Sequence, residues 1–250
     1  MFINDINIIY YVLIGILGLF VGQFVDWLNI RLPDYKKVFS KEFFTKYIAN
    51  FKPNYILAFT NAILYIAILY FIGWQESPMY KIELIKYLVL TPMLLSALVI
   101  DFKLQIIPNR LNLSIFEIGI LFTFIEAIFS IDLAINELLG ALVGAGIFLM
   151  LTLIGGLIAG KEAMGFGDVK LMGALGLFFG WVDIIAVSLI AFLLGAIISV
   201  ALIITKKKKT DEYIPFGPFI VIASIIVMIV PFDILLLVLL KIFTLGMYQG

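Results

Sequence analysis

The sequence predicts an all-α protein, a polytopic membrane helix bundle of about eight transmembrane helices. Hydrophobic residues make up 64% of the chain and charged residues only 14%, whereas soluble domains are roughly half apolar and a quarter charged. Long apolar runs alternate with short polar segments, and about 20 apolar residues span the hydrocarbon layer of a bilayer. We therefore expect a single transmembrane domain over residues 1–250, with a lipid bilayer as its surroundings.

The individual spans follow from the apolar runs. They lie at about 8–30, 55–74, 85–100, 113–131, 138–158, 169–181, 184–205 and 216–230. A last apolar stretch, 234–245, is short and predicts at most a partial span. The first run has no basic segment before it and no small-residue cleavage site after it, which indicates a retained helix and not a secretory signal.

Residue types that are missing from the chain exclude several kinds of chemistry. The sequence contains no cysteine and no histidine. Disulfides, thiolate or histidine zinc sites and Ser-His-Asp hydrolysis are therefore excluded, and we expect neither a metal nor a cofactor for any hydrolytic chemistry. The formal net charge is zero, so no nucleic-acid partner is indicated.

The distribution of lysine and arginine predicts the orientation. When the connections are assigned to alternate sides, one side receives Arg31, the lysines of the loop 32–54, Lys103, Arg110, Lys161, Lys170 and the run Lys206 to Lys209. The other side receives Lys81, Lys86 and Lys241. The rich side is expected to be cytoplasmic, with the N-terminus outside and the loop 32–54 a short cytoplasmic loop. Asp101 and Asp168 both fall at the cytoplasmic face of the plasma membrane.

The first candidate catalytic motif begins at Asp101, directly after an apolar run. It continues to Ile107-Pro108-Asn109, where the proline ends or redirects the preceding helix. A carboxylate inside a membrane segment is costly, at roughly 2.5–3.5 kcal/mol, and it usually has a function. The structural alternative is a side chain that reaches the membrane surface beside Lys103.

The second candidate motif is Gly165-Phe166-Gly167-Asp168-Val169-Lys170. Two glycines one residue apart disfavour regular helix and leave room for another backbone to lie close. An endopeptidase needs such room, because its peptide substrate must be extended before the carbonyl is attacked. The structural alternative for Asp168 is a helix cap.

The two aspartates together suggest acid–base hydrolysis. Carboxylates within a few ångström of each other cannot both ionise readily, so the pair holds one proton. The ionised member can take a proton from water while the other donates a proton to the peptide carbonyl. Such assistance is worth typically 10²–10⁴-fold in rate.

These motifs, in this order, resemble the type IV prepilin peptidase family. The resemblance covers most of the chain: Gly22-Gln23-Phe24 and Arg31-Leu32-Pro33 near the start, Asp101 with Ile107-Pro108-Asn109, Glu162 to Leu171, and Ile214-Pro215-Phe216-Gly217-Pro218-Phe219. It implies a membrane aspartic endopeptidase that removes the basic leader of type IV prepilins or pseudopilins after a glycine at the cytoplasmic face. Asp101 and Asp168 fall on the catalytic positions. The resemblance extends supporting roles to Pro108, Asn109, Glu162, Gly165, Phe166, Gly167, Lys170, Pro215, Phe216, Gly217 and Pro218.

The loop 32–54 departs from the family pattern. Many bacterial members carry two Cys-Xaa-Xaa-Cys pairs there that hold zinc, and they also methylate the new N-terminus with S-adenosylmethionine. This loop is short, rich in lysine and free of cysteine, so zinc is excluded there and methylation is put in doubt. Asp26 is also unusual, and we expect it to pair with Arg31 or to line the site. Glu117 and Glu126 lie in an apolar span and are expected to face protein.

Two other readings remain open from the sequence. An intramembrane protease of the presenilin or signal-peptide-peptidase kind shares the glycine-aspartate string and would cut within the bilayer. A small proton or cation transporter would use the buried acids for binding. The Ile-Pro-Asn context favours the prepilin reading over the first, and the lack of matching interrupted helices counts against the second.

Overall fold

A computed structural model describes residues 2–4, 6–38, 40–50, 52–159, 164–205 and 214–243. Within these residues the fold is helical, apart from a short antiparallel pair of β1 (Phe2–Ile3) and β2 (Ile6–Asn7). A short π-helical segment, η1, spans Phe43–Ile48. The α-helices are α1 (Ile8–Arg31), α2 (Tyr55–Ile72), α3 (Pro78–Leu104), α4 (Asn109–Ala127), α5 (Ile131–Ala159), α6 (Phe166–Ile204), α7 (Gly217–Ile229) and α8 (Phe232–Phe243).

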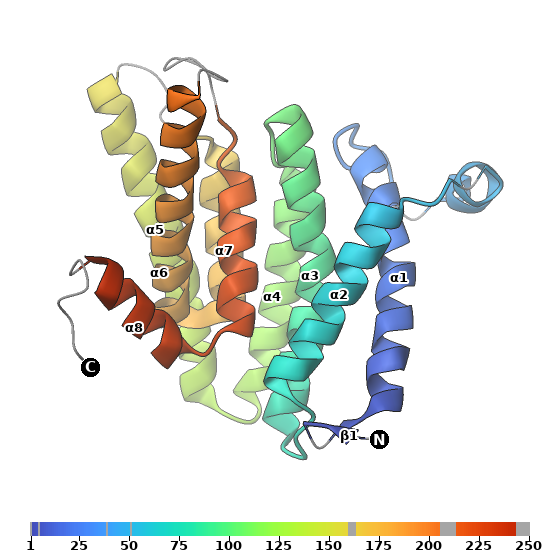
Figure 1. Cartoon of the computed structure of the whole chain (residues 1–250). Coiled ribbons are helices and arrows are strands. Elements are labelled where there is room, and N and C mark those ends of the chain that lie inside the picture. Colours follow the sequence, from blue (N-terminus) through green and yellow to red (C-terminus); the bar gives the residue numbers. More distant parts are fainter. Residues whose placement is uncertain are drawn as a thin grey trace.

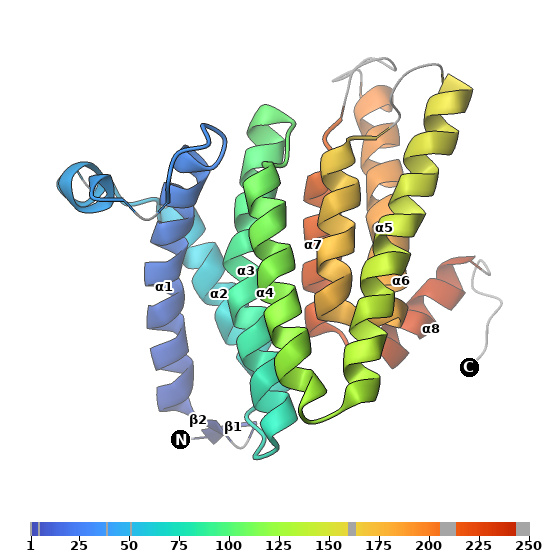
Figure 2. The ribbon, with the colours of Figure 1, turned by 180° about the vertical axis from the view of Figure 1, so that it is seen from behind.

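The helices form one bundle with alternating directions. Figures 1 and 2 show α1 to α5 running up and down in turn, so that the end of α3 and the start of α6 lie at the same end of the bundle. Among the described residues, α1, α2, α3, α5 and α6 are long and apolar enough to cross a membrane. The all-α membrane bundle is thus confirmed, and the number of eight spans remains a prediction.

Helix α6 is two antiparallel halves joined at Gly180. This residue has φ 74° and ψ 177°, a conformation that favours glycine because it has no Cβ. In the first half, Met172 lies against Gly144 of α5 and Gly176 lies against Gly140, one turn earlier in α5. In the second half, Ile184 lies against Gly144 and Phe192 stacks on Phe148, one turn later in α5. The first half therefore runs against α5 and the second half runs along it, as Figure 1 shows.

A side chain of α5 bonds to the backbone at the turn inside α6. Asn136 Oδ1 accepts a hydrogen bond of 3.2 Å from the Trp181 backbone N–H, which the break would otherwise leave unpaired. At about 1.5 Å per residue the first half, 166–179, is only about 21 Å long, shorter than the ~30 Å hydrocarbon layer. Backbone breaks at membrane depth are tolerated where protein covers them, and Asn136 provides that cover here.

Pro92 lies inside α3 and has a compensating partner. A proline has no N–H, so the Leu88 carbonyl one turn earlier loses its helical hydrogen bond. The Tyr65 hydroxyl of α2 donates to this carbonyl at 2.7 Å, and Tyr65 is 3% exposed. This contact ties α2 to the helix that carries Asp101.

A buried ion cluster joins α3, α4 and α5 at the end of the bundle away from Asp101. Lys86 Nζ lies 2.8 Å from Glu126 Oε1 and 2.5 Å from Glu137 Oε1, and all three residues are buried. Two carboxylates share one ammonium group, and Glu137 Oε2 has no hydrogen-bond partner among the described residues. Glu126 thus faces protein as predicted, whereas Glu117 is exposed and the prediction for it was wrong.

We expect Lys86→Met to destabilise the protein, because removal of one partner leaves buried charge without compensation. The free energy of unfolding should fall by about 3–5 kcal/mol, measured by denaturation in mixed micelles. The exposed Lys241 supplies the control, since Lys241→Met should change the value by about 0.5 kcal/mol or less. Equal stability of the two variants would contradict the role of the cluster.

Candidate functional site

Asp101 lies in the last turn of α3 and is held by the start of α7. Helix α3 ends at Gln105, whose φ of 57° is left-handed, and the Gln105 N–H bonds back to the Asp101 carbonyl at 2.8 Å. The side chain is 3% exposed. Its Oδ2 accepts a hydrogen bond of 2.9 Å from the Gly217 backbone N–H. Asp101 is therefore inside the protein and does not reach the membrane surface as the structural alternative required.

Asp168 lies in the first turn of α6, where negative charge is favoured by the helix dipole. Gly165 is the N-cap residue and contributes no side-chain cap. Asp168 is also 3% exposed, and its Oδ1 has no hydrogen-bond partner among the described residues. A buried carboxylate oxygen without a donor is costly, so this oxygen is available for a ligand or for water.

The two motifs meet through direct contacts around the carboxylates. The carboxyl groups of Asp101 and Asp168 are close enough for a Coulomb interaction between them. Lys170 Nζ donates to Asn109 Oδ1 at 2.8 Å. A Cβ built on Gly167 would lie 3.3 Å from the Ile107 Cβ, so the second motif packs against the first.

The late motif completes the arrangement. A Cβ on Gly217 would lie 2.6 Å from Asp101 Oδ2, so only glycine allows this approach. Pro218 occupies the first turn of α7, where its missing N–H has no cost. Phe216 packs against the rings of Phe148, Phe192 and Phe219. These contacts hold the segment that carries Gly217 in place.

For the remaining residues of the family motifs, the structure gives the position in the fold and the burial. Pro108 is the N-cap of α4 and is buried, and Pro215 is partly buried just before α7. Phe166 is exposed and Gly165 is partly buried. Glu162 lies outside the described residues.

Sequence reasoning missed Asn112. Its Nδ2 donates to the Gly167 carbonyl at 2.9 Å, which joins α4 to the glycine-aspartate motif. The residue is 4% exposed, and its Oδ1 has no partner among the described residues. A lone amide between two leucines of an apolar run was the available signal, since such a group needs a partner in a membrane helix.

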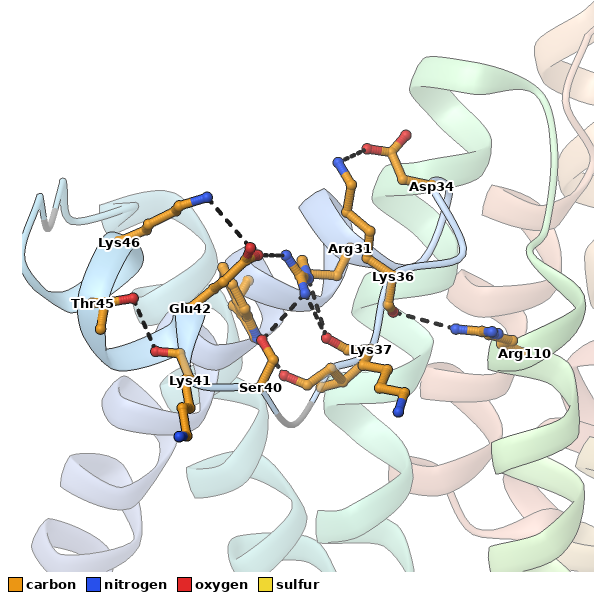
Figure 3. A network of polar contacts seen from close by, with 12 residues as sticks. Arg31, Asp34, Lys36, Lys37, Ser40, Lys41, Glu42, Thr45, Lys46 and Arg110 are labelled. Carbon is orange, nitrogen blue, oxygen red and sulfur yellow. Dashed lines mark hydrogen bonds and ion pairs between the residues drawn. The ribbon is translucent and has the colours of Figure 1, made fainter.

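The loop 32–38 is held by two arginines (Figure 3). Arg31 is 8% exposed, pairs with Glu42, and donates to the Lys37 carbonyl at 2.9 Å and to Ser40 Oγ at 3.2 Å. Arg110, at the start of α4, donates to the Tyr35 carbonyl at 2.6 Å. The loop thereby spans from the end of α1 to the helix that follows the first motif.

Asp26 does not pair with Arg31, so that expectation was wrong. Its Oδ1 accepts from Asn54 Nδ2 at 2.8 Å and its Oδ2 accepts from the Tyr47 hydroxyl at 3.1 Å. Arg31 is occupied by Glu42 instead. Burial, together with the nearby Asp26, raises the pKa of the Tyr47 hydroxyl, so Tyr47 remains a donor. Asp26 lines a cavity of about 450 Å³. Lys103, which is two residues beyond Asp101, lines the same cavity.

The described part of the chain contains no recognisable metal-binding site. No group of three or more acidic side chains there is arranged to hold an ion. The chemistry that the site offers is that of two buried carboxylates, one held by a backbone donor and one with a free oxygen.

Comparison with known proteins identifies this region. Residues 88–200 match the family model of the Type IV leader peptidase family. This stretch of the chain is similar to a type IV leader peptidase domain. Asp101, Asn112 and Asp168 all lie inside the matched stretch, and Gly217 follows it.

The proteins to which the chain is similar share a name. The chain is similar to proteins named "Prepilin leader peptidase/N-methyltransferase" from Aeromonas hydrophila (34% identity, 55% of this chain and 46% of the relative), Legionella pneumophila (33%, 60% and 51%) and Pseudomonas aeruginosa (32%, 60% and 48%). The matches thus span about half the length of these relatives. No solved structure matches the chain. The five long apolar helices among the described residues and the match to the leader peptidase family model indicate an integral membrane protein.

We expect Glu42→Gln to loosen the first loop. The hydrogen bond from Arg31 holds the pKa of Glu42 below its ordinary value, so at neutral pH the carboxylate is charged and its stabilising contribution is present, to be lost as the pH falls through the lowered pKa. Trypsin should therefore cut after Lys36, Lys37 and Lys41 faster in the variant at neutral pH. Asp34→Asn removes an exposed pair, 54% and 56% exposed, and should leave the rate unchanged.

Proposed function

We propose that this protein is an aspartic endopeptidase that removes the leader of type IV prepilins or pseudopilins. The observation that carries the proposal is that Asp101 is bonded to the Gly217 N–H and lies within Coulomb range of Asp168, with both carboxyl groups buried and the three residues in separate segments. The match to the leader peptidase family model and the names of the relatives support the same activity. Asp101 and Asp168 are the proposed catalytic pair.

The contacts support different roles for the two carboxyl groups. A hydrogen bond from a backbone N–H stabilises a carboxylate, and Asp101 receives one from Gly217. We assign Asp101 as the ionised base that takes a proton from water. Asp168 holds the shared proton and donates it to the peptide carbonyl oxygen. The attacking oxygen bonds to the carbonyl carbon. Asp101 then passes the proton that it took from water to the nitrogen, Asp168 takes its proton back from the former carbonyl oxygen, and collapse of the tetrahedral species breaks the C–N bond.

The distribution of charge supports a cytoplasmic active site. The end of the bundle that carries Asp101 and Asp168 also carries the lysine-rich loop and Arg110 (Figures 1 and 3). Of the few lysines near the opposite end, Lys86 is neutralised by Glu126 and Glu137. Lysine and arginine gather on the cytoplasmic side of membrane proteins, so we propose that the N-terminus lies outside and that leaders are cut at the inner leaflet of the plasma membrane.

Methyl transfer is a separate question. The relatives' name includes N-methyltransferase, and the cofactor would be S-adenosylmethionine. Every contact that supports our proposal concerns the two carboxylates, so leader removal is the activity that we assign. Incubation of a prepilin with and without S-adenosylmethionine, followed by mass measurement of the products, reports each activity independently.

We expect Asp101→Asn and Asp168→Asn each to abolish leader removal, because either change destroys the shared-proton pair. The assay is cleavage of a purified prepilin by protein in lipid nanodiscs, with circular dichroism to show that the variants are folded. Asp132→Asn provides the matched control, since Asp132 is exposed at the start of α5, and it should retain full activity. Cleavage by either of the first two variants would refute the pair.

We expect Gly217→Ala to reduce the cleavage rate by about 10²-fold, because a displacement near 1 Å of a catalytic group has an effect of that size. The added methyl group would lie 2.6 Å from Asp101 Oδ2 and must displace it. Gly146→Ala is the control, as a Cβ there meets no atom within 4 Å. An unchanged rate in Gly217→Ala would remove the backbone donor from the proposal.

Mapping the cut bond separates this proposal from a presenilin-like protease. A leader peptidase cuts before the hydrophobic helix of its substrate, whereas an intramembrane protease cuts inside it. A transporter would give pH-dependent flux in liposomes without any proteolysis.

A further inference from the structure

An apolar groove of about 600 Å³ lies beside the carboxylate pair, between α4, α5 and the first half of α6. Leu113 and Phe116 form one wall and Leu142 forms the other. All three side chains are exposed, with Leu142 at 72%. An apolar groove on the flank of a membrane protein suits a hydrophobic helix or a lipid chain, and further features distinguish these occupants.

The floor of the groove is made of small residues. Gly173 and Ala174 of α6 and Ala141 and Ala145 of α5 line it, and a Cβ on Gly173 would lie 3.1 Å from the Ala145 Cβ. Small residues let a helix approach closely in lipid, where association depends on packing and not on the hydrophobic effect. The groove therefore has the surface of a helix-packing site.

One end of the groove is polar, and it is the end near the catalytic residues. Asn109, Asn112 and Lys170 line it. Asn109 and Lys170 are bonded to each other, but Asn112 Oδ1 is buried and lacks a partner among the described residues. Its Nδ2 is fixed on the Gly167 carbonyl, which defines the other atom of the amide as an acceptor.

An acceptor at the polar end of the groove, without a partner among the described residues, matches the needs of a helix start. The first four N–H groups of a helix have no partner inside that helix, and an unsatisfied buried polar group costs about 1–3 kcal/mol. A hydrogen bond from a peptide N–H at the start of a bound helix to Asn112 Oδ1 would give both groups a partner. A lipid acyl chain offers no such donor.

The groove and the catalytic pair share the same short segment. Val169 lines the groove and directly follows Asp168, while Asn112 is bonded to Gly167, directly before it. A helix whose first turn lies at Asn112 would place the residues that precede it beside the carboxylates. Cleavage would then fall at the boundary between the leader and the hydrophobic helix.

We propose that this groove binds the hydrophobic helix of the peptidase substrate, with Asn112 as a positioning residue that accepts an N–H from the start of that helix. The proposal rests on the proposed leader peptidase function. It assigns specificity for a hydrophobic segment to α4, α5 and α6, separately from the two aspartates.

Photocrosslinking tests the occupant of the groove. The photoreactive amino acid benzoylphenylalanine replaces Phe116 in the groove or, as a control, Phe59 of α2, which lines another apolar groove and is also exposed. We expect Phe116 to crosslink to the first turns of the hydrophobic segment of a labelled prepilin, and Phe59 to give no such product. Crosslinks to lipid alone, to a second copy of the protein, or equally from both positions would overturn the proposal.

Kinetics test the groove and Asn112 independently. Leu113→Trp fills the groove, and Leu121→Trp adds the same bulk at an equally exposed position on α4 outside it (55% and 57% exposed). Leu113→Trp and Asn112→Ala should raise KM for a full-length prepilin at least tenfold with a smaller change in kcat. Asn112→Gln, which keeps both an amide donor for the Gly167 carbonyl and an acceptor, should recover part of the loss. Unchanged KM values would overturn the proposal.

The two proposals fail in different ways. If the wild-type protein removes the leader but Phe116 forms no substrate crosslink, the groove is wrong and the peptidase stands. If the wild-type protein leaves every prepilin intact while Phe116 still crosslinks to its helix, the peptidase fails and the helix-binding groove remains.

Discussion

The hydrogen bond from the Gly217 N–H to the Asp101 carboxylate is the contact on which the site depends. Asp101 is buried at the end of α3, where an ionised carboxylate without a donor would be strongly disfavoured. The donor comes from a segment more than a hundred residues later in the chain. It can reach Asp101 only because residue 217 has no Cβ and because the Phe216 ring is fixed among three other aromatic rings.

The rest of the bundle brings these segments to one end and holds them there. Gly180 turns α6 back on itself, so that α6 begins at the end of the bundle where α3 ends and also returns to that end before α7 starts (Figure 2). Pro92 and its partner Tyr65 fix α2 on α3. The Lys86 cluster fixes α3, α4 and α5 at the opposite end. Because charges and broken backbone are costly in lipid, each of these irregular points is paired with a side chain of a neighbouring helix.

The proposed catalytic pair and the proposed substrate groove lie side by side in this arrangement. Asp101 contacts the start of α7, whereas Val169 and Lys170, the residues that follow Asp168, line the groove between α4 and α5. One short segment of α6 can therefore carry acid–base chemistry on one side and helix recognition on the other. Asn112, bonded to Gly167 with its oxygen still unpaired, stands between them.

The sequence alone determined the all-α membrane fold, the position of the apolar runs and the two aspartates with their glycine and proline context. These features follow from local patterns, because a bilayer demands long apolar segments and penalises isolated charges. It also anticipated separate segments on either side of residue 180. Only the tertiary structure decided which partners the polar groups take. Arg31 pairs with Glu42 and not with Asp26, Glu126 pairs with Lys86, and Asn112 bonds to Gly167. Glu117 is exposed on the surface of the bundle. Such pairings depend on the rotation and depth of each helix within the bundle, which are set by side-chain packing between distant segments and leave no periodic mark in the sequence.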